Sequence, residues 1–196
     1  MQRGLIVTLF QTKYRTESSR LKDWDYSNPW WNYVTINTKN HEEYFGHVEN
    51  GNMILNQFGK IVDEEWLKTK TIRTNVDLDF FVVMPTHLHG IVIINGSEVE
   101  THRVRLQDNP NFISGDACNA SLRKIYNSLS HIIGGFKSAA TKRIREIGFE
   151  EFCWQSRFYD RIIRNETEPL NIRRYIEQNP LKWEFEKGKP ENIFPF

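Results

Sequence analysis

The sequence predicts an α+β fold in which helices cover one face of an antiparallel β-sheet. Two observations support this class: strand-like and helix-like segments follow one another along the chain, and most connections between them are short. With 196 residues, 39% of them hydrophobic, the chain is long enough to bury one sizeable core. We therefore expect a single domain over residues 29–188, between an N-terminal extension (residues 1–28) and a C-terminal tail (residues 189–196).

The first half of this domain contains strand-like segments and one helical segment. Residues 30–40 (WWNYVTINTKN) alternate bulky or β-branched residues with polar ones, which is typical of a strand. In residues 45–56 the dipeptide Asn50-Gly51 separates two short apolar runs and favours the type I′ turn of a β-hairpin. Residues 56–69 then change period and predict an amphipathic helix with an apolar face of Phe58, Ile61, Val62 and Trp66.

A second hairpin is expected in the middle of the sheet. Residues 78–84 (LDFFVVM) and 87–94 (HLHGIVII) are apolar strand candidates joined by the tight connection Pro85-Thr86. Residues 95–120, which are rich in Gly, Asn, Ser, Asp and Pro, predict a long surface loop.

A long helix is expected over residues 121–148. The adjacent Gly134 and Gly135 inside it predict a kink or the close approach of another backbone. The buried stripe of this helix would consist of Ile125, Leu129, Ile132, Phe136, Ala140 and Ile144.

The last helix is expected over residues 167–180. Thr167 is suited to the N-cap position, and Pro169 falls in the first turn, where proline is tolerated. Because proline lacks a backbone N–H, Pro180 is expected to end the helix after Asn179.

The overall charge does not identify a partner. The chain has 26 basic and 25 acidic residues, a formal net charge of +1, so any electrostatic argument depends on local clustering. Cys118 and Cys153 form no CxxC pair and no secretion signal is visible, which predicts reduced thiols in the cytoplasm. No segment approaches the roughly 20 apolar residues of a membrane-spanning helix.

His87 and His89 stand one residue apart in the otherwise apolar segment VMPTHLHGIVII. On a strand, side chains two positions apart point to the same face, with Cα atoms roughly 6–7 Å apart. Two neutral imidazoles at this spacing can share one divalent cation. The alternative interpretation, more frequent for an isolated pair of this kind, is that both are inert polar residues at the end of a strand.

The sequence near His87 and His89 lacks the further ligands of the common three-ligand metal sites. A cupin-like oxygenase would need a carboxylate and another histidine shortly downstream, but the apolar run GIVII follows His89 and Glu98 already lies in the loop. A zinc site would favour cysteines or further histidines at regular spacing. The remaining histidines form no second pair; they are His41, His47, His102 and His131.

Tyr175 and Asn179 in RRYIEQNP provide the other half of a candidate site. They are four residues apart, so they lie one above the other on one helix face. An asparagine amide oxygen can bind a hard cation, and a tyrosine hydroxyl becomes a nucleophile where its proton is easily lost. The alternative is that Tyr175 is a packing residue and Asn179 an ordinary helix end. Together with the histidines, however, the pair suits phosphodiester transfer by a metal and a tyrosine nucleophile.

At these residues the chain resembles a known family. VVMPTHLHGIVII is similar to the HUH motif (His, hydrophobic, His) of single-tyrosine insertion-sequence transposases, and residues 154–183 resemble their tyrosine-helix region. The group it resembles most is that of the REP-associated tyrosine transposases. The resemblance runs over residues 20–184, nearly the whole chain.

The resemblance implies a single HUH-endonuclease domain with a ferredoxin-like or RRM-like antiparallel sheet. It also implies a Mg²⁺ or Mn²⁺ cofactor bound by His87, His89 and Asn179, and Tyr175 as the nucleophile. The substrate would be a single-stranded DNA hairpin of the repetitive palindromic type, cleaved through a 5′-phosphotyrosine intermediate. Such a protein would act in the cytoplasm at the nucleoid, and relatives are known both as monomers and as homodimers that exchange the tyrosine helix.

Two departures from the family pattern are visible. Thr86 stands where relatives often have Asn or Glu before the first histidine, which would change hydrogen bonding around the ligands but removes no ligand. The loop at residues 95–120 looks like a variable insertion without a catalytic role.

Basic residues gather in the second half of the chain. Residues 121–174 contain 11 basic and six acidic residues, a difference of +5, which leaves the rest of the chain at −4. Cations interleaved with aromatic rings suit single-stranded DNA. The candidate DNA-binding residues are Arg157, Arg161, Arg164, Lys137, Arg173, Arg174, Trp154 and Tyr159. Tyr159 is also a rival nucleophile, but no polar residue at a helical offset accompanies it.

Two other function classes stay open. The first is a catalytically inactive DNA- or RNA-binding module with an RRM-like sheet, although the aromatic RNP motif is absent and all four expected site residues are present. The second is a metal-dependent enzyme acting on small molecules, which would need an apolar pocket in place of the basic flank.

Overall fold

The structure of the protein is a computed structural model. The described residues are 9–10, 14–15, 25–26, 28–96, 128–164 and 167–186. Most of the expected loop at residues 95–120 and Ile125 of the expected helix lie outside them, as do the C-terminal tail and most of the N-terminal extension. Within that extension, β1 (Leu9–Phe10) and β2 (Tyr14–Arg15) pair with each other.

The centre of the domain is a four-stranded antiparallel sheet with the order β6-β7-β3-β8. The strands are β3 (Trp30–Asn37), β6 (Val76–Val83), β7 (His87–Ile94) and β8 (Tyr159–Ile162). Helix α1 (Gln57–Ile72) connects β3 to β6, and α3 (Leu129–Glu146) lies between β7 and β8 in the chain. This βαββαβ order is the ferredoxin-like arrangement, so the predicted α+β class and sheet type are confirmed.

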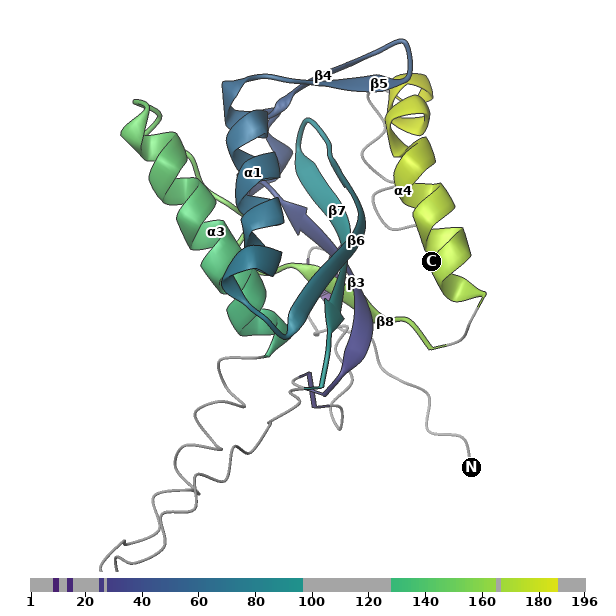
Figure 1. Ribbon diagram of the computed structural model, residues 1–196. Helices are drawn as coiled ribbons and strands as arrows, with labels where there is room; N and C mark the ends of the chain where they lie inside the picture. The colour runs from purple at the N-terminus through teal and green to yellow at the C-terminus, as the bar shows by residue number, and fades with distance from the viewer. Residues whose placement is uncertain are drawn as a thin grey trace, which may run out of the picture.

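Helices pack on both faces of this sheet, so the expectation that they cover only one face is wrong (Figure 1). Helices α1 and α3 lie on one face, and α4 (Glu168–Phe185) lies on the other. The cause is visible in β7, where Leu88 and Val92 join the core beneath α1 and α3 while Ile91 joins a second cluster beneath α4. A strand that is apolar on both faces has to be covered on both.

The expected hairpin of β6 and β7 is present and antiparallel, but only β7 is central, because β6 forms an edge of the sheet. Strand β8, at the opposite edge, was not anticipated from the sequence. It has only four residues, and its charged Asp160 and Arg161 obscure the strand pattern.

The larger core forms where α1 and α3 meet the sheet. Trp66 is fully buried, with its ring 5.1 Å from that of Phe136. A Cβ atom at Gly90 would lie 2.6 Å from the Trp66 ring, so only glycine allows this packing. Helix α3 runs without a break through Gly134 and Gly135, and the group that approaches Gly135 closely is the Arg73 guanidinium, not a backbone as expected.

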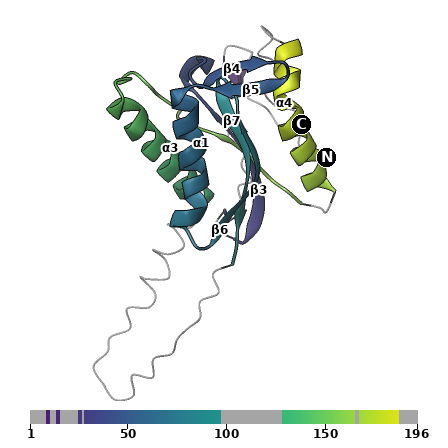
Figure 2. The ribbon, with the colours of Figure 1, turned by 45° about the horizontal axis from the view of Figure 1, so that its top comes forward.

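The small hairpin of β4 (Gly46–Glu49) and β5 (Asn52–Leu55) follows a short 3₁₀ helix, η1 (Lys39–His41), and precedes α1. Asn50 and Gly51 have φ angles of 51° and 70°, the positive values that a type I′ turn requires, which confirms the predicted turn. Figure 2 shows that this hairpin reaches across to the C-terminal end of α4.

Helix α4 begins after Thr167 with Pro169 in its first turn, as expected, but continues through Pro180 to Phe185. The prediction that Pro180 ends the helix is wrong. Pro180 leaves the Ile176 carbonyl without its helical hydrogen bond, yet Pro180 is buried, and packing of this turn outweighs that loss. The continuation matters because the last two turns carry Trp183 and Glu184.

No helix in the described parts of the chain is both long enough and apolar enough to span a membrane.

A buried ion pair between α1 and α3 generates a pH prediction. Burial alone would raise the pKa of the Glu65 carboxyl, but hydrogen bonds from Lys68 and Arg143 outweigh it and leave the pKa below its ordinary value of 4.5. Because the folded pKa is below the unfolded one, this stabilisation is complete above about pH 4.5 and is lost as the pH falls through the folded pKa.

We expect Glu65→Gln to lower the free energy of unfolding by about 1–2 kcal/mol at pH 7. Thermal denaturation followed by circular dichroism should show the difference in Tm shrinking toward pH 3. Glu64, which is exposed and bonds to the same Arg143, is the matched control, and Glu64→Gln should cost less than about 0.5 kcal/mol. A Tm difference that does not change with pH would contradict this assignment.

Candidate active site

His87 and His89 lie side by side on the face of β7 that α4 covers. Both are almost fully buried, with exposed fractions of 2% and 1%, and their Nε2 atoms are 2.9 Å apart. The ring centroids are 4.4 Å apart, with the rings nearly perpendicular. The strand period therefore does bring the two imidazoles together, as the sequence predicts.

Hydroxyl groups hold the other nitrogen of each ring. The Thr86 Oγ1 atom lies 2.8 Å from His87 Nδ1. The Tyr33 hydroxyl and Thr35 Oγ1 lie 2.7 Å and 2.9 Å from His89 Nδ1. When these oxygens accept Nδ1–H, the Nε2 lone pairs of both rings converge on one point.

Tyr33 and Thr35 were not identified as site residues from the sequence. A signal was present, however: they alternate on one face of β3, and Thr35 is the direct cross-strand partner of His89. Predicting this contact requires the register between β3 and β7, which the chain alone does not reveal.

Burial keeps both imidazoles neutral. It lowers the pKa of His87 from its ordinary value of 6.5 to about 3, and a charge on nearby His41 would lower it further. Burial, with His87 beside it, also holds the pKa of His89 well below 6.5. Neutral imidazoles keep a lone pair on nitrogen, which is the form that binds a metal ion.

Helix α4 places Tyr175 and Asn179 over the histidines. The Tyr175 ring lies 5.4 Å from the His89 ring and 6.4 Å from that of Tyr33, edge-on to both. Burial raises the pKa of the Tyr175 hydroxyl above 10, and its hydrogen bond with the buried Asn179 side chain opposes this shift. The structure thus brings together, within one chain, all four residues that the sequence analysis singled out.

Trp183 completes the cover of the site, with its ring 5.8 Å from that of His87. Trp183 was not a candidate residue because the helix was expected to end at Asn179. Lys182 also lies close, with its Nζ 5.7 Å from the centre of the Tyr175 ring. Both contacts depend on the continuation of the helix beyond Pro180.

Polar contacts at three places along α4 hold it in this position. At the C-terminal end, the backbone N–H groups of Gly51 and Asn50 donate to the Glu184 carboxylate at 2.7 Å and 3.2 Å. In the middle, Arg173 donates to Asp79 on β6 at 2.7 Å. At the N-terminal end, Arg161 on β8 pairs with Glu168 at 2.6 Å.

Three candidate DNA-binding residues gather near the N-terminal end of α4. Tyr159, Arg161 and Arg164 line a hollow of about 620 Å³, together with Asn171. The Tyr159 ring lies 6.4 Å from that of Tyr33, which in turn contacts the Tyr175 ring. The hollow therefore lies next to the site.

Two more candidate residues lie on α4, and a third precedes β8. Arg173 stacks over the rings of Trp31 and Phe80 while it pairs with Asp79. Arg174 is exposed on α4, and Arg157 is exposed before β8.

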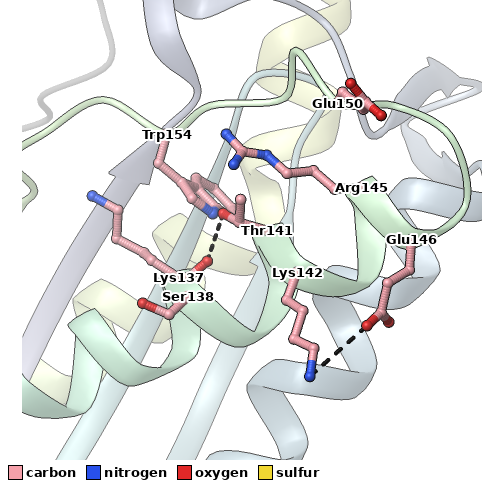
Figure 3. A pocket seen from close by; sticks show the side chains of 8 residues that line it. All are labelled: Lys137, Ser138, Thr141, Lys142, Arg145, Glu146, Glu150 and Trp154. Carbon is pink, nitrogen blue, oxygen red and sulfur yellow. Dashed lines mark hydrogen bonds and ion pairs between the residues drawn. The ribbon is translucent and has the colours of Figure 1, made fainter.

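Lys137 and Trp154 do not join the histidine site. Both line a separate hollow beside α3, on the other face of the sheet (Figure 3). The Lys137 ammonium donates to the Gln155 carbonyl at 2.5 Å, and the Trp154 ring packs against Phe136 and Phe152. Their assignment as DNA contacts near Tyr175 gains no support from this placement.

The donor atoms present fit a divalent cation. Two neutral imidazole nitrogens converge, and the Asn179 amide lies on the helix that covers them. Among the residues that the structure describes, no group of three or more His, Cys, Asp or Glu side chains could hold a metal ion. A cation at the histidines would therefore depend on neutral donors and on oxygens supplied by a substrate.

Comparisons with known proteins bear on this arrangement. No protein-family model matches the chain. An uncharacterized protein of Haemophilus influenzae is 33% identical over 178 residues, which are 88% of this chain and 95% of that protein.

Two solved structures align with the fold. A REP-associated tyrosine transposase bound to a REP hairpin aligns with a TM-score of 0.51 and 20% identity, over 84% of this chain and 73% of that one. A candidate transposase from Deinococcus radiodurans aligns with a TM-score of 0.42 and 12% identity, over 81% of this chain and 96% of that one. The first alignment confirms, at the level of the fold, the resemblance seen in the sequence.

The contact between Glu184 and the β4–β5 turn generates a prediction about α4. We expect Glu184→Gln to loosen the last turn of the helix, because a charged acceptor for two amides is replaced by a neutral one. Hydrogen exchange of the Gly51 amide should accelerate about tenfold, which corresponds to about 1.4 kcal/mol. Glu177→Gln, an exposed change on the same helix, should leave it unchanged. Equal exchange rates in both variants would show that this contact does not hold α4.

Proposed function

Because the chain belongs to the same family as the Haemophilus influenzae protein and has the fold of a REP-associated tyrosine transposase, we propose that it is a single-strand DNA endonuclease and transposase. It would cleave and rejoin DNA near hairpins and depend on Mg²⁺ or Mn²⁺. The observation that carries the proposal is the Tyr175 ring 5.4 Å from the His89 ring, above two converging imidazoles. The related transposase is bound to a REP hairpin, which supports a hairpin substrate.

The proposed reaction is a transesterification at phosphorus. The Tyr175 oxygen attacks the scissile phosphate in line, forming an O–P bond as the bond from phosphorus to the 3′-oxygen breaks. The tyrosine loses its proton, and the departing 3′-oxygen gains one. The products are a 5′-phosphotyrosine and a free 3′-hydroxyl. Because the ester conserves the bond energy, attack by a 3′-hydroxyl can rejoin the strand without ATP.

The side chains around Tyr175 have distinct tasks in this proposal. His87, His89 and Asn179 would hold the divalent cation, which supplies polarisation of the phosphate when bound. Asn179 also orients the Tyr175 hydroxyl through their hydrogen bond. Burial and the charge of Glu186 raise the pKa of the Tyr175 hydroxyl. Lys182, whose Nζ lies over the Tyr175 ring, would oppose this rise and favour the phenolate.

The DNA strand would approach along the hollow at the N-terminal end of α4. Arg161 and Arg164 supply positive charge there, and Tyr159 supplies an aromatic surface. Arg174 and Arg157 extend this charge on the exposed surface. With chromosomal DNA as its substrate, the protein would act in the cytoplasm at the nucleoid.

The decisive experiment concerns the nucleophile. Wild-type protein is incubated with a single-stranded hairpin oligonucleotide from the flanks of its own gene, with Mg²⁺ or Mn²⁺ present. We expect a covalent protein–DNA band on a denaturing gel, and we expect Tyr175→Phe to abolish it. Tyr159→Phe, which changes the rival tyrosine, should retain the band.

The possible outcomes separate the two assignments. A band that persists in Tyr175→Phe and disappears in Tyr159→Phe would overturn the choice of nucleophile. Binding of hairpins without any cleavage by the wild type would favour a nucleic-acid-binding module that lacks catalysis.

A further prediction concerns Lys182. Removing its charge should raise the free energy of the Tyr175 phenolate, so Lys182→Met should slow formation of the covalent band about tenfold, one pKa unit of the nucleophile. The rate is measured at saturating oligonucleotide so that weaker binding does not contribute. Lys142→Met removes an exposed charge from α3 on the other face and should leave the rate unchanged. Equal rates in both variants would exclude a role for Lys182 in activation.

A further inference from the structure

A buried asparagine lies beside the histidine pair, on the strand next to β7. Asn37 is the last residue of β3, is 4% exposed, and is the direct cross-strand partner of His87. Residues opposed in this way project to the same face, with Cβ atoms roughly 4.5–5.5 Å apart. Asn37 therefore shares the face of the sheet that carries both histidines and that α4 covers.

Among the described residues, none donates a hydrogen bond to the Oδ1 atom of the Asn37 amide. A buried acceptor left in this state costs about 1–3 kcal/mol. The Asn37 oxygen is thus available as a metal ligand, and its burial in this state is not explained by folding alone.

A missing partner alone does not mark a site, as a second residue of the same strand shows. Asn32 is 2% exposed, and its Oδ1 also lacks a donor among the described residues. Asn32 is paired with Val92, however, and belongs to the face covered by α1 and α3. What distinguishes Asn37 is its place beside two imidazoles whose Nε2 atoms converge.

The charge and the number of metal ligands at the histidines allow a further oxygen ligand. Two imidazoles and the Asn179 amide are all neutral, and no carboxylate cluster joins them among the described residues. Mg²⁺ and Mn²⁺ favour oxygen ligands and close to octahedral geometry, so three protein donors leave about three positions.

We propose that Asn37 is a further metal ligand, whose Oδ1 binds the same divalent cation as His87, His89 and Asn179. This inference rests on the proposed function. It places the cation between β3, β7 and α4, so that donors from the sheet and from the tyrosine helix meet at one ion. The remaining coordination positions of the cation are left for phosphate oxygens. These oxygens bring the negative charge that the four neutral side chains do not supply.

The test measures Mn²⁺ affinity directly, by titration calorimetry and by the electron paramagnetic resonance signal of free Mn²⁺. We expect Asn37→Ala to bind Mn²⁺ about tenfold more weakly than the wild type. We expect Asn37→Asp, which keeps the shape and adds a negative oxygen, to bind it about tenfold more tightly. Asn32→Ala is the matched control, because it removes an equally buried amide from the other face and should leave the affinity unchanged.

Each outcome decides the inference. Unchanged affinity in Asn37→Ala, or an equal loss in Asn32→Ala, would overturn it, as would a wild type that binds no Mn²⁺. If Asn37→Ala does not fold, the isosteric Asn37→Asp decides, because no gain in affinity would reject a ligand role.

Cleavage of the hairpin oligonucleotide by the wild type is scored separately. Cleavage together with unchanged Mn²⁺ affinity in the variants rejects only the role of Asn37. Mn²⁺ binding that depends on Asn37, without cleavage of any hairpin, rejects only the proposed nuclease.

Discussion

The antiparallel pairing of β3 with β7 is the constraint on which the candidate site depends. Its register sets Thr35 opposite His89 and Asn37 opposite His87. A slip of one residue would turn every side chain of β3 to the other face, so the hydroxyl groups that hold His89 would enter the apolar core beneath α1 and α3. The apolar partners in the same two strands, such as Ile36 and Leu88, favour the observed register because they are fully buried in that core.

This pairing makes the centre of the sheet polar on one face, and burial determines the protonation state of the two histidines there. In water, two histidines this close would be partly protonated and would repel each other. Here burial lowers the pKa of both, and hydroxyl groups from β3 and from Thr86 satisfy their Nδ1 atoms. When these hydroxyl oxygens accept Nδ1–H, the two Nε2 lone pairs face each other 2.9 Å apart, a situation in which a shared cation is favourable.

The sequence predicted those features that depend on local period and turn chemistry. The strand period aligned His87 with His89, Asn50-Gly51 defined the type I′ turn, and helical spacing placed Tyr175 above Asn179. It failed where tertiary packing overrides local preference. Pro180 is accommodated inside α4, β8 owes its existence to β3, and the face that α4 covers follows from a strand that is apolar on both sides.

Helix α4 has to satisfy two opposed requirements. It carries Tyr175 and Asn179 and so completes the site, but while it is docked it covers both histidines almost completely. A phosphate oxygen can reach the Nε2 atoms only if part of the helix shifts. The contacts at its ends are suited to this, since Glu184 and Arg161 lie partly or fully at the surface, where each contact contributes only about 0.5–1.5 kcal/mol. In the proposed function, these contacts at the ends of the helix would be exchanged for contacts with the DNA strand.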